Sequence, residues 1–218
     1  MLIVNVLIKR SSLMRITKEN REKTRRELIE AARTLFRDTG FGATTTRAIA
    51  SNARIAVGTV FNYFNSKELL GAAVLSESIA VAEEEFEQVE RAQASLDEVL
   101  FGFVALHLRH MRKDRSWARE VLGERYAASG CEDPALDLRG RHLARVERWL
   151  TAERNRANSN TATNSNLQLD LHLYWTLILG VFNYWAFDES HNQEATLALL
   201  DRSIELFTRG LQMEPIPE

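Results

Sequence analysis

Proline, glycine and cysteine are scarce in this chain of 218 residues. It has three prolines, all at or beyond residue 134, and ten glycines. Because proline breaks helices and glycine weakens them, their scarcity favours long helices. Alternating patterns of β-branched residues are almost absent after the first eight positions, so little in the chain predicts strands. The sequence therefore predicts an all-α protein.

The single cysteine, Cys131, excludes an intrachain disulfide. No Cys/His spacing typical of a metal site occurs either, so we expect no metal and no cofactor. One lone thiol fits a reducing compartment, and we expect the protein in the cytoplasm. The apolar run MLIVNVLI at the start is not arranged like a signal peptide and is too short to span a bilayer. We expect residues 1–16 to form a disordered or extended tail.

Sequence signals of catalysis are also missing. There is no Gly-rich phosphate loop, no zinc-ligand spacing and no nucleophile elbow, so we do not expect an enzyme. A helical-bundle enzyme without such motifs is the alternative from that class.

The net charge of −2 conceals an uneven distribution. Residues 1–70 hold 13 Lys and Arg against 6 Asp and Glu, a balance of +7. The remainder holds 15 against 24, a balance of −9. A basic N-terminal third on an acidic body predicts a module that faces nucleic acid, although such a division can also arise by chance.

Residues 44–70 read TTTRAIASNARIAVGTVFNYFNSKELL. They predict two short helices, Thr46–Ala53 and Val57–Phe64, joined by a tight turn. Apolar residues are spaced to face one small core, while Thr59, Asn62 and Tyr63 point outward. Such a helix-turn-helix can place its second helix in the major groove of DNA. A preceding amphipathic helix, Thr17–Thr39, would end at Gly40 in a left-handed cap, with Phe41 folding back on it. We assign residues 17–70 to this DNA-binding domain.

The rest of the chain predicts a larger helical bundle, giving about nine helices in total. Ser95 and Glu98 form a capping box for one helix, and the polar segment 155–166 predicts a mobile loop. Residues 71–213 would form this second domain, which includes the dimerisation helices, followed by a frayed tail at 214–218. Polar positions within 167–187, including Asp170, argue against a bilayer span. The apolar segments 167–187 and 194–211 instead predict a homodimer built on an intersubunit four-helix bundle.

Three segments resemble the TetR/AcrR family of transcriptional regulators: AARTLFRDTGF, TTTRAIA and VGTVFNYFNSKELL. The resemblance is motif-level from about residue 25 to 70 and implies binding to double-stranded DNA. It gives Thr46 a phosphate contact and places Arg47 on phosphate or a base edge. The groove-facing side of the recognition helix would comprise Val57, Gly58, Thr59 and Asn62. The sugar-phosphate backbone would pack against Phe61 and Tyr63, and Lys67 would make a further phosphate contact.

Three positions depart from the family pattern. Arg54 stands where glycine is usual in the turn, and a left-handed conformation there would cost about 1 kcal/mol. Ala56 replaces the usual serine cap, at a cost of roughly 1 kcal/mol. Phe61 replaces tyrosine and loses a hydroxyl group. These changes weaken the argument for DNA binding without removing it.

The resemblance further implies an unknown small-molecule effector in the C-terminal helices, which makes residues 71–213 an effector-binding and dimerisation domain. Candidate pocket residues are Phe103, His107, Trp117, Tyr126, Trp149, Trp175 and Phe182. The alternative is that these side chains are ordinary core, which is the commoner role for buried aromatics and histidines. The patterns predict a homodimer that binds DNA, and the resemblance implies a repressor that a ligand releases from pseudo-palindromic DNA. A helical dimeric adaptor that has lost DNA binding is the alternative.

Overall fold

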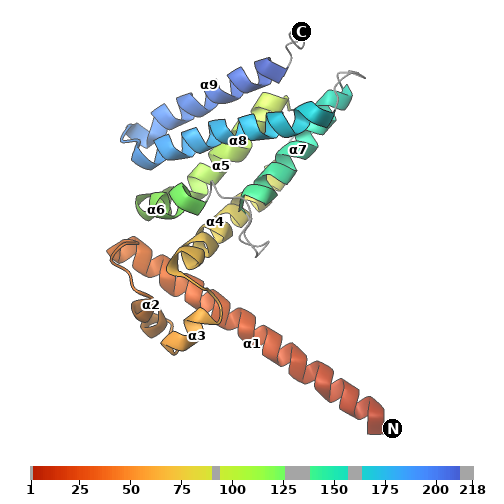
Figure 1. Cartoon of the computed structure of the whole chain (residues 1–218), viewed down its shortest axis with the longest axis vertical. Coiled ribbons are helices and arrows are strands. Elements are labelled where there is room, and N and C mark those ends of the chain that lie inside the picture. The colour runs from red at the N-terminus through yellow and green to blue at the C-terminus, as the bar shows by residue number, and fades with distance from the viewer. Residues whose placement is uncertain (1, 90–93, 126–137, 157–163, 212–218) are drawn as a thin grey trace. The chain divides into compact units, whose positions relative to one another are not determined.

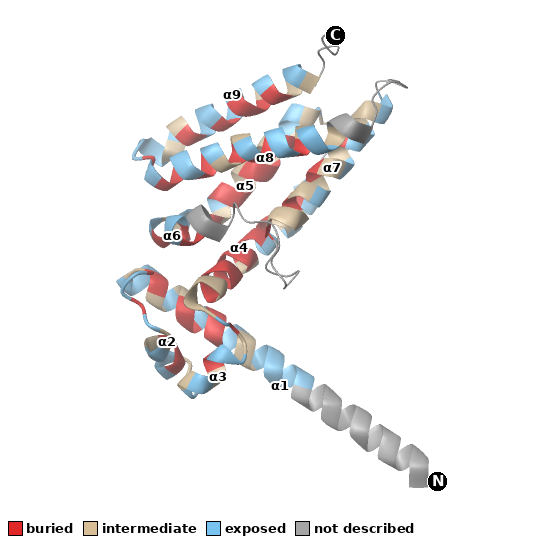
Figure 2. Ribbon diagram, in the orientation of Figure 1, coloured by how far each residue is buried: buried red, intermediate tan, exposed pale blue. Residues whose placement is uncertain are grey.

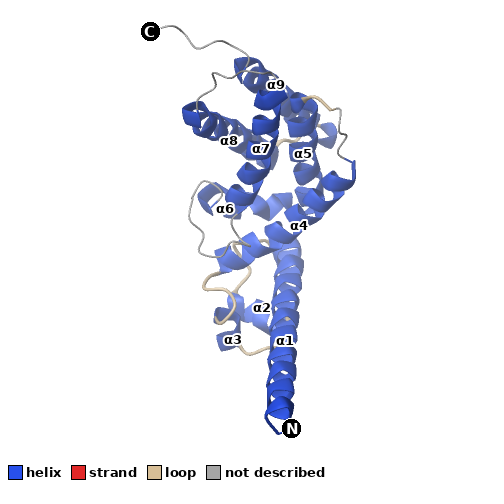
Figure 3. Ribbon diagram, turned by 90° about the vertical axis from the view of Figure 1, so that its right-hand side faces the viewer, coloured by secondary structure: helices blue, strands red, loops and turns tan. Residues whose placement is uncertain are grey.

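The computed structural model describes residues 2–89, 94–125, 138–156 and 164–211. Within these ranges the chain forms helices α1 to α9 and two short 3₁₀ turns, with no strand (Figures 1 and 3). The predicted all-α fold with about nine helices is therefore confirmed. The chain divides into two compact units, Met1–Val74 and Leu75–Glu218. This division falls inside α4, Lys67–Val89, whereas the sequence placed a boundary at residue 70.

The N-terminal unit contains α1 (Leu2–Thr39), α2 (Thr46–Asn52) and α3 (Val57–Phe61). The prediction of a disordered or extended tail over 1–16 is wrong, because α1 begins at Leu2. No proline or glycine occurs between positions 2 and 39, so nothing in the sequence ends the helix before Thr17. The core of this unit is apolar and fully buried, and it includes Leu28, Ile29, Ala32, Phe36, Ile49, Ala50, Val60 and Phe64.

The end of α1 has the predicted cap. Gly40 adopts a φ of 85°, and its N–H donates to the carbonyl of Phe36 at 3.2 Å. Phe41 then folds back, with its ring centroid 4.8 Å from that of Phe36, and is only 5% exposed. Glycine suits this left-handed position because it has no Cβ to clash. The cap directs the chain toward α2.

The C-terminal unit takes the rest of α4 together with α5 (Leu96–Met111), α6 (Arg115–Arg125), α7 (Leu138–Arg156), α8 (Asn164–Phe187) and α9 (Glu194–Leu211). The predicted capping box of α5 is confirmed, since the Glu98 carboxylate accepts from the Ser95 N–H at 3.0 Å. The structure contradicts both predicted ends of the mobile loop over 155–166. There α7 runs to Arg156 and α8 begins at Asn164, because this polar segment holds no proline or glycine to stop a helix. Residues 157–163 and the tail at 214–218 lie outside the described residues.

The core of the C-terminal unit is rich in aromatic side chains. α8 packs against α6, α7 and α9, and α5 packs against α7 and α9. Fully buried residues line these contacts (Figure 2), among them Trp117, Trp185, Tyr174, Phe103, Leu100 and Ile178. Burying each large apolar side chain contributes about 1.5–3 kcal/mol, so this unit has ample driving force to fold.

No helix in the described parts of the chain combines the length and the apolar character needed to cross a bilayer.

Candidate nucleic-acid interface

Local hydrogen bonds hold α2 and the turn that follows it. Thr45 caps α2, its hydroxyl oxygen accepting from the Ala48 N–H at 3.1 Å. At the other end, the Ile55 N–H donates to Ala50 O at 2.9 Å and the Arg54 N–H donates to Ser51 O at 3.1 Å. This pair of bonds is a Schellman motif, which requires a left-handed residue at position 54. Arg54 has a φ of 57°, as expected for the residue that replaces glycine here.

α3 presents one face to solvent and one to the core. Val60 is 1% exposed and Phe64 is 3% exposed, so both anchor the helix. The opposite face is formed by half-buried Val57 and by the exposed residues Gly58, Phe61 and Asn62. Ala56 precedes α3 with no side-chain cap, as the sequence predicted. The short helix is therefore fixed by its buried face rather than by its first turn.

Gly58 leaves the exposed face of α3 open. A Cβ built at this position would meet nothing within 4 Å. The glycine is therefore not needed for contacts within the protein, since alanine would fit and would favour the helix by about 1 kcal/mol. Glycine instead suits a surface that a rigid partner must approach closely, because it has no side chain to hold the partner away.

The other predicted contact residues lie on α2, on α3 and just beyond α3. Arg47 is exposed on α2, Thr46 and Thr59 are half-buried, and Tyr63 is half-buried just beyond α3. The guanidinium of Arg21 lies 5.9 Å from the centre of the Tyr63 ring. A cationic group thus lies beside a polar side chain just beyond α3, and groups of both kinds make phosphate contacts.

Lys67 has a structural role that the sequence did not predict. Its ammonium donates to the carbonyls of Phe41 at 2.7 Å, Thr44 at 3.0 Å and Gly42 at 3.4 Å, and lies 4.4 Å from the centre of the Phe41 ring. These bonds engage all three ammonium donors. Lys67 therefore fixes the loop between α1 and α2 in this conformation, and its phosphate contact stays a prediction.

Comparison with known proteins agrees with this geometry. Residues 28–74 match the model of the family described as "Bacterial regulatory proteins, tetR family". Residues 99–218 match the one described as "Tetracyclin repressor-like, C-terminal domain". The chain belongs to the TetR family. It is a TetR-family transcriptional regulator with a helix-turn-helix DNA-binding domain.

Individual TetR-family relatives are distant. The HTH-type transcriptional regulator UidR of Escherichia coli is 27% identical over 161 residues, covering 69% of this chain and 78% of UidR. A structure of Thermus thermophilus FadR in complex with lauroyl-CoA is 21% identical, with a TM-score of 0.67 over 89% of this chain and 98% of FadR. One of RolR with resorcinol is 24% identical, with a TM-score of 0.60 over 92% of this chain and 98% of RolR. These two structures support the fold.

The predicted effector-pocket residues of this TetR-family chain are partly brought together. Phe103 lies with its ring centroid 4.4 Å from that of His107 and 5.0 Å from that of Trp149. Trp175 is linked to them by His142, whose ring centroid lies 5.6 Å from that of Trp175. Trp117 instead donates to the Asp114 carboxylate at 3.3 Å. Phe182 is buried on α8, and Tyr126 lies outside the described residues.

Sequence reasoning missed two members of this cluster, His142 on α7 and Tyr174 on α8. The His142 Nε2 and the Tyr174 hydroxyl are hydrogen bonded at 2.9 Å. Burial, with the charge of Arg145 nearby, lowers the pKa of His142 to about 3. Burial holds the pKa of His107 well below its usual value, and the charges of His142 and Arg145 lower it further. Both imidazoles are therefore neutral at pH 7. His142 lies on the apolar stripe of α7 with Val146 and Leu150, and that was the signal available in the sequence.

Proposed function

We propose that this TetR-family regulator is a homodimeric repressor of pseudo-palindromic operator DNA, released by a small molecule bound in its C-terminal unit. The exposed face of α3 carries the proposal. Val57, Gly58, Phe61 and Asn62 lie outward from an anchored helix, within a basic N-terminal third. Inserting this face into a major groove would bring these side chains to base edges and backbone.

Each proposed contact follows from side-chain chemistry. The Asn62 amide can pair with the edge of adenine, and the Thr59 hydroxyl can donate to or accept from a base. Arg47 is exposed and can reach phosphate or guanine. Thr46 would bind phosphate, while Phe61 and Tyr63 would pack against the sugar-phosphate backbone.

Fluorescence anisotropy on DNA from the region upstream of the chain's own gene tests the DNA claim. We expect binding whose affinity falls steeply with salt, because released counterions accompany each phosphate contact. Asn62→Ala should change sequence preference more than the salt slope. Its matched control is Asn52→Ala, an exposed asparagine at the end of α2. Absence of salt-dependent binding at low ionic strength would favour the adaptor, to which strained Arg54 and uncapped Ala56 also point.

An apolar surface on α8 and α9 supports the homodimer. Leu169 is 68% exposed, Leu173 50% and Phe187 63% on α8, and Leu206 is 53% exposed on α9. Exposed residues on α8 recur at spacings of three and four, at positions 169, 173, 176, 180, 184 and 187. This spacing suits the seam of a helical bundle. A second copy of the chain, meeting the same surface about a twofold axis, would cover it.

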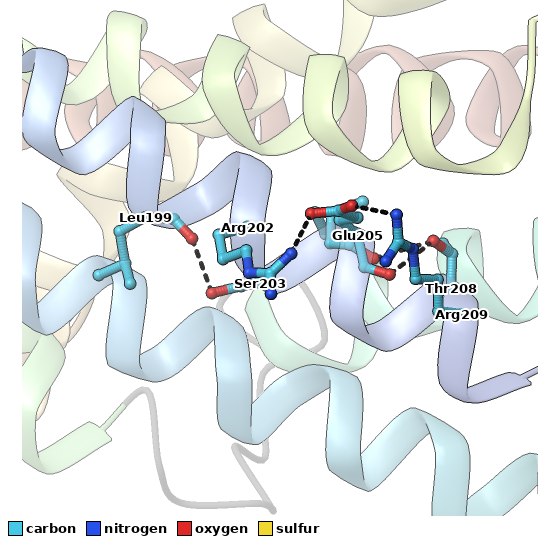
Figure 4. A network of polar contacts seen from close by, with 7 residues as sticks. Leu199, Arg202, Ser203, Glu205, Thr208 and Arg209 are labelled. Atoms are coloured by element: carbon cyan, nitrogen blue, oxygen red, sulfur yellow. Dashed lines mark hydrogen bonds and ion pairs between the residues drawn. The ribbon is translucent and has the colours of Figure 1, made fainter.

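The shape of the same surface also supports a second copy. A groove of about 740 Å³ runs between α8 and α9, lined by Gly180, Tyr184, Phe187 and Leu199 among others. On α9, Glu205 joins Arg202 and Arg209 at 2.5 and 2.6 Å, and Ser203 donates to Leu199 O (Figure 4). These ion pairs are solvent-exposed and contribute little stability. The apolar residues, not the charges, would therefore drive association.

Light scattering and sedimentation at micromolar concentration test the dimer. We expect a dimer for the unmodified chain and a monomer for Leu206→Glu or Leu173→Glu, because a carboxylate would be buried without a partner. Val81→Glu is the matched control, since Val81 is 53% exposed on α4. A monomeric unmodified chain would remove the dimer from the proposal.

The proposal that a ligand releases the repressor draws on the structural relatives. FadR and RolR have solved structures with lauroyl-CoA and resorcinol respectively. A ligand that binds the conformation unable to bind DNA more tightly than the DNA-binding conformation would weaken operator binding. The size of the effect is set by the ratio of the ligand's affinities for these two conformations. Operator anisotropy in the presence of a candidate ligand measures that coupling directly.

A further inference from the structure

Two buried histidines face each other inside the C-terminal unit. His107 on α5 and His142 on α7 are each 1% exposed, and their ring centroids are 5.4 Å apart. His142 uses Nε2 to reach the Tyr174 hydroxyl. Among the described residues, no hydrogen-bond partner exists for His107 Nδ1, His107 Nε2 or His142 Nδ1. The pair therefore presents unused hydrogen-bonding atoms in the interior.

Flat aromatic side chains enclose the pair. Phe103 lies 4.4 Å from His107 and 4.8 Å from His142, between ring centroids. Tyr174 stacks on His142 at 5.7 Å, and Trp175 meets it edge-on at 5.6 Å. Behind Phe103, Trp149 lies at 5.0 Å and contacts Phe86 at 5.6 Å. Aromatic surroundings of this kind favour a flat apolar molecule, through offset or edge-on ring contacts.

The unused nitrogens carry a free-energy cost. Leaving a buried polar group without a partner costs about 1–3 kcal/mol, so a chain gains little from two such histidines unless something binds them. Two imidazoles alone are too few ligands for a structural zinc site, and no group of three or more metal-ligating side chains occurs among the described residues.

The charge state of the cluster decides between ligand classes. Each neutral imidazole offers one donor and one acceptor, which a hydroxyl group can satisfy simultaneously. The nearby cation Arg145 is paired with Glu87 and lies 5.8 Å from the centre of the Phe103 ring. Arg141, on α7 beside His142, also acts on His107 and makes a contact of its own. A carboxylate buried here would therefore meet neutral rings and cations that already make other contacts, and would keep most of its desolvation cost. An uncharged ligand therefore fits better than an anion.

We infer that His107, His142 and Tyr174 form the recognition site for the effector, and that the effector is an uncharged, flat aromatic molecule bearing a hydroxyl group. This inference rests on the proposed function, because it supplies the ligand that would control DNA binding. In this site the hydroxyl of the ligand pairs with the unused nitrogens of the two imidazoles, and its ring contacts the aromatic side chains around them.

Calorimetric titration of the full chain with three matched probes tests the ligand class. The probes are 2-naphthol, naphthalene and 2-naphthoate at pH 7.5, which share one ring system. We expect 2-naphthol to bind at least tenfold more tightly than either of the others, since one hydrogen bond of about 1.4 kcal/mol corresponds to tenfold. Tighter binding of 2-naphthoate, or no binding of any probe at its solubility limit, would overturn the inference.

Substitution of His107 tests the site itself. His107→Leu should weaken 2-naphthol binding at least tenfold and leave the melting temperature of the ligand-free chain unchanged or higher, because a costly unpaired group is removed. His107→Gln restores a neutral donor and acceptor, so it should recover part of the affinity. The control is His172→Leu on α8, an exposed ring hydrogen bonded to Gln168 O at 2.6 Å.

The remaining outcomes separate this inference from the proposed function. A His107→Leu variant that binds 2-naphthol normally, or that melts lower than the unmodified chain, would show a purely structural histidine and overturn the inference. Calorimetry needs no DNA, so failure here would leave operator binding standing. A chain that binds 2-naphthol through His107 but binds no DNA would support the inferred ligand site and contradict the proposed repressor function.

Discussion

At the level of single residues, Arg54 and Lys67 act on the same small domain in opposite directions. Arg54 adopts a left-handed conformation, with a φ of 57°, that costs an ordinary residue about 1–2 kcal/mol. Lys67 donates three hydrogen bonds to the loop between α1 and α2 and stabilises it. Neither effect depends on DNA, so each can be measured on the isolated chain.

We predict that Arg54→Gly stabilises the N-terminal unit by roughly 0.5–1 kcal/mol, because glycine adopts positive φ without a steric penalty. Urea unfolding monitored by circular dichroism measures the change. Arg54→Ala is the control, since it removes the guanidinium but keeps a Cβ. Equal stability of the two variants would show that the left-handed turn carries no strain.

Lys67→Met should destabilise the N-terminal unit by about 1.5–3 kcal/mol, the range for hydrogen bonds made by a charged group. We also expect weaker DNA binding with an unchanged salt slope, because the ammonium is engaged by carbonyls. Arg47→Met is the comparison: it should preserve stability and reduce the slope by about 0.9 for each phosphate that is no longer neutralised. A similar slope reduction for Lys67→Met would assign the lysine a direct phosphate contact instead.

At the level of elements, the junction between α8 and α9 is organised by one carboxylate. Asp188 is 5% exposed and accepts from the Ser190 N–H at 2.8 Å and from the Thr196 N–H at 2.9 Å, while the Thr196 hydroxyl donates at 2.5 Å. Burial opposes ionisation, but hydrogen bonds from Thr196 and Ser190 outweigh it and lower the pKa of Asp188 well below its usual value. The ionised group thus caps the first turn of α9.

Asp188→Asn should lower the free energy of unfolding by about 1–2 kcal/mol, as for the loss of a helix cap. The lowered pKa means that the stabilising effect of Asp188 is complete above the unfolded-state pKa of about 3.9 and is lost as the pH falls from there toward the folded-state pKa. The Asn variant should therefore lose less stability between pH 5 and pH 3. Thermal unfolding across this pH range measures the loss of stability. Glu189→Gln, at the exposed neighbouring position, is the control.

Helix signals in the sequence were most reliable where they were local. The caps at Gly40, Thr45 and Ser95 each depend on residues within a few positions, and all three are confirmed. The predicted start of the first helix and the predicted ends of the loop after α7 were wrong. Polar or mixed segments without proline or glycine contain no signal that shows where a helix stops. Lys67 binds carbonyls 23 to 26 positions away, and His142 meets Tyr174 32 positions away. Only the tertiary fold creates such pairs.

At the level of the whole molecule, folding is coupled to protons through the buried histidines. Burial lowers the pKa of His142 to about 3 and lowers that of His107 as well. In the unfolded chain both would titrate near a pKa of about 6.5. Acid therefore favours the unfolded state, which binds more protons than the folded state does.

We predict that the free energy of unfolding falls as the pH is lowered from about 6.5 toward about 4, by up to about 1.4 kcal/mol per pH unit for each buried histidine. His107→Leu should reduce this slope, and His172→Leu, on the exposed face of α8, should not. Chemical unfolding at half-unit pH intervals measures the slope. An unchanged slope in His107→Leu would mean that this histidine is already protonated in the folded chain.

The open space beside Gly58 has a consequence for how such a regulator diversifies. Because a Cβ there meets nothing within 4 Å, the fold tolerates many side chains at this position. Val60, on the same short helix but buried at 1% exposure, has no such freedom. Position 58 can therefore change without a compensating stabilising mutation elsewhere in the N-terminal unit. A library randomised at this codon should yield folded proteins, so any change in their DNA binding would test the proposed role of this position directly.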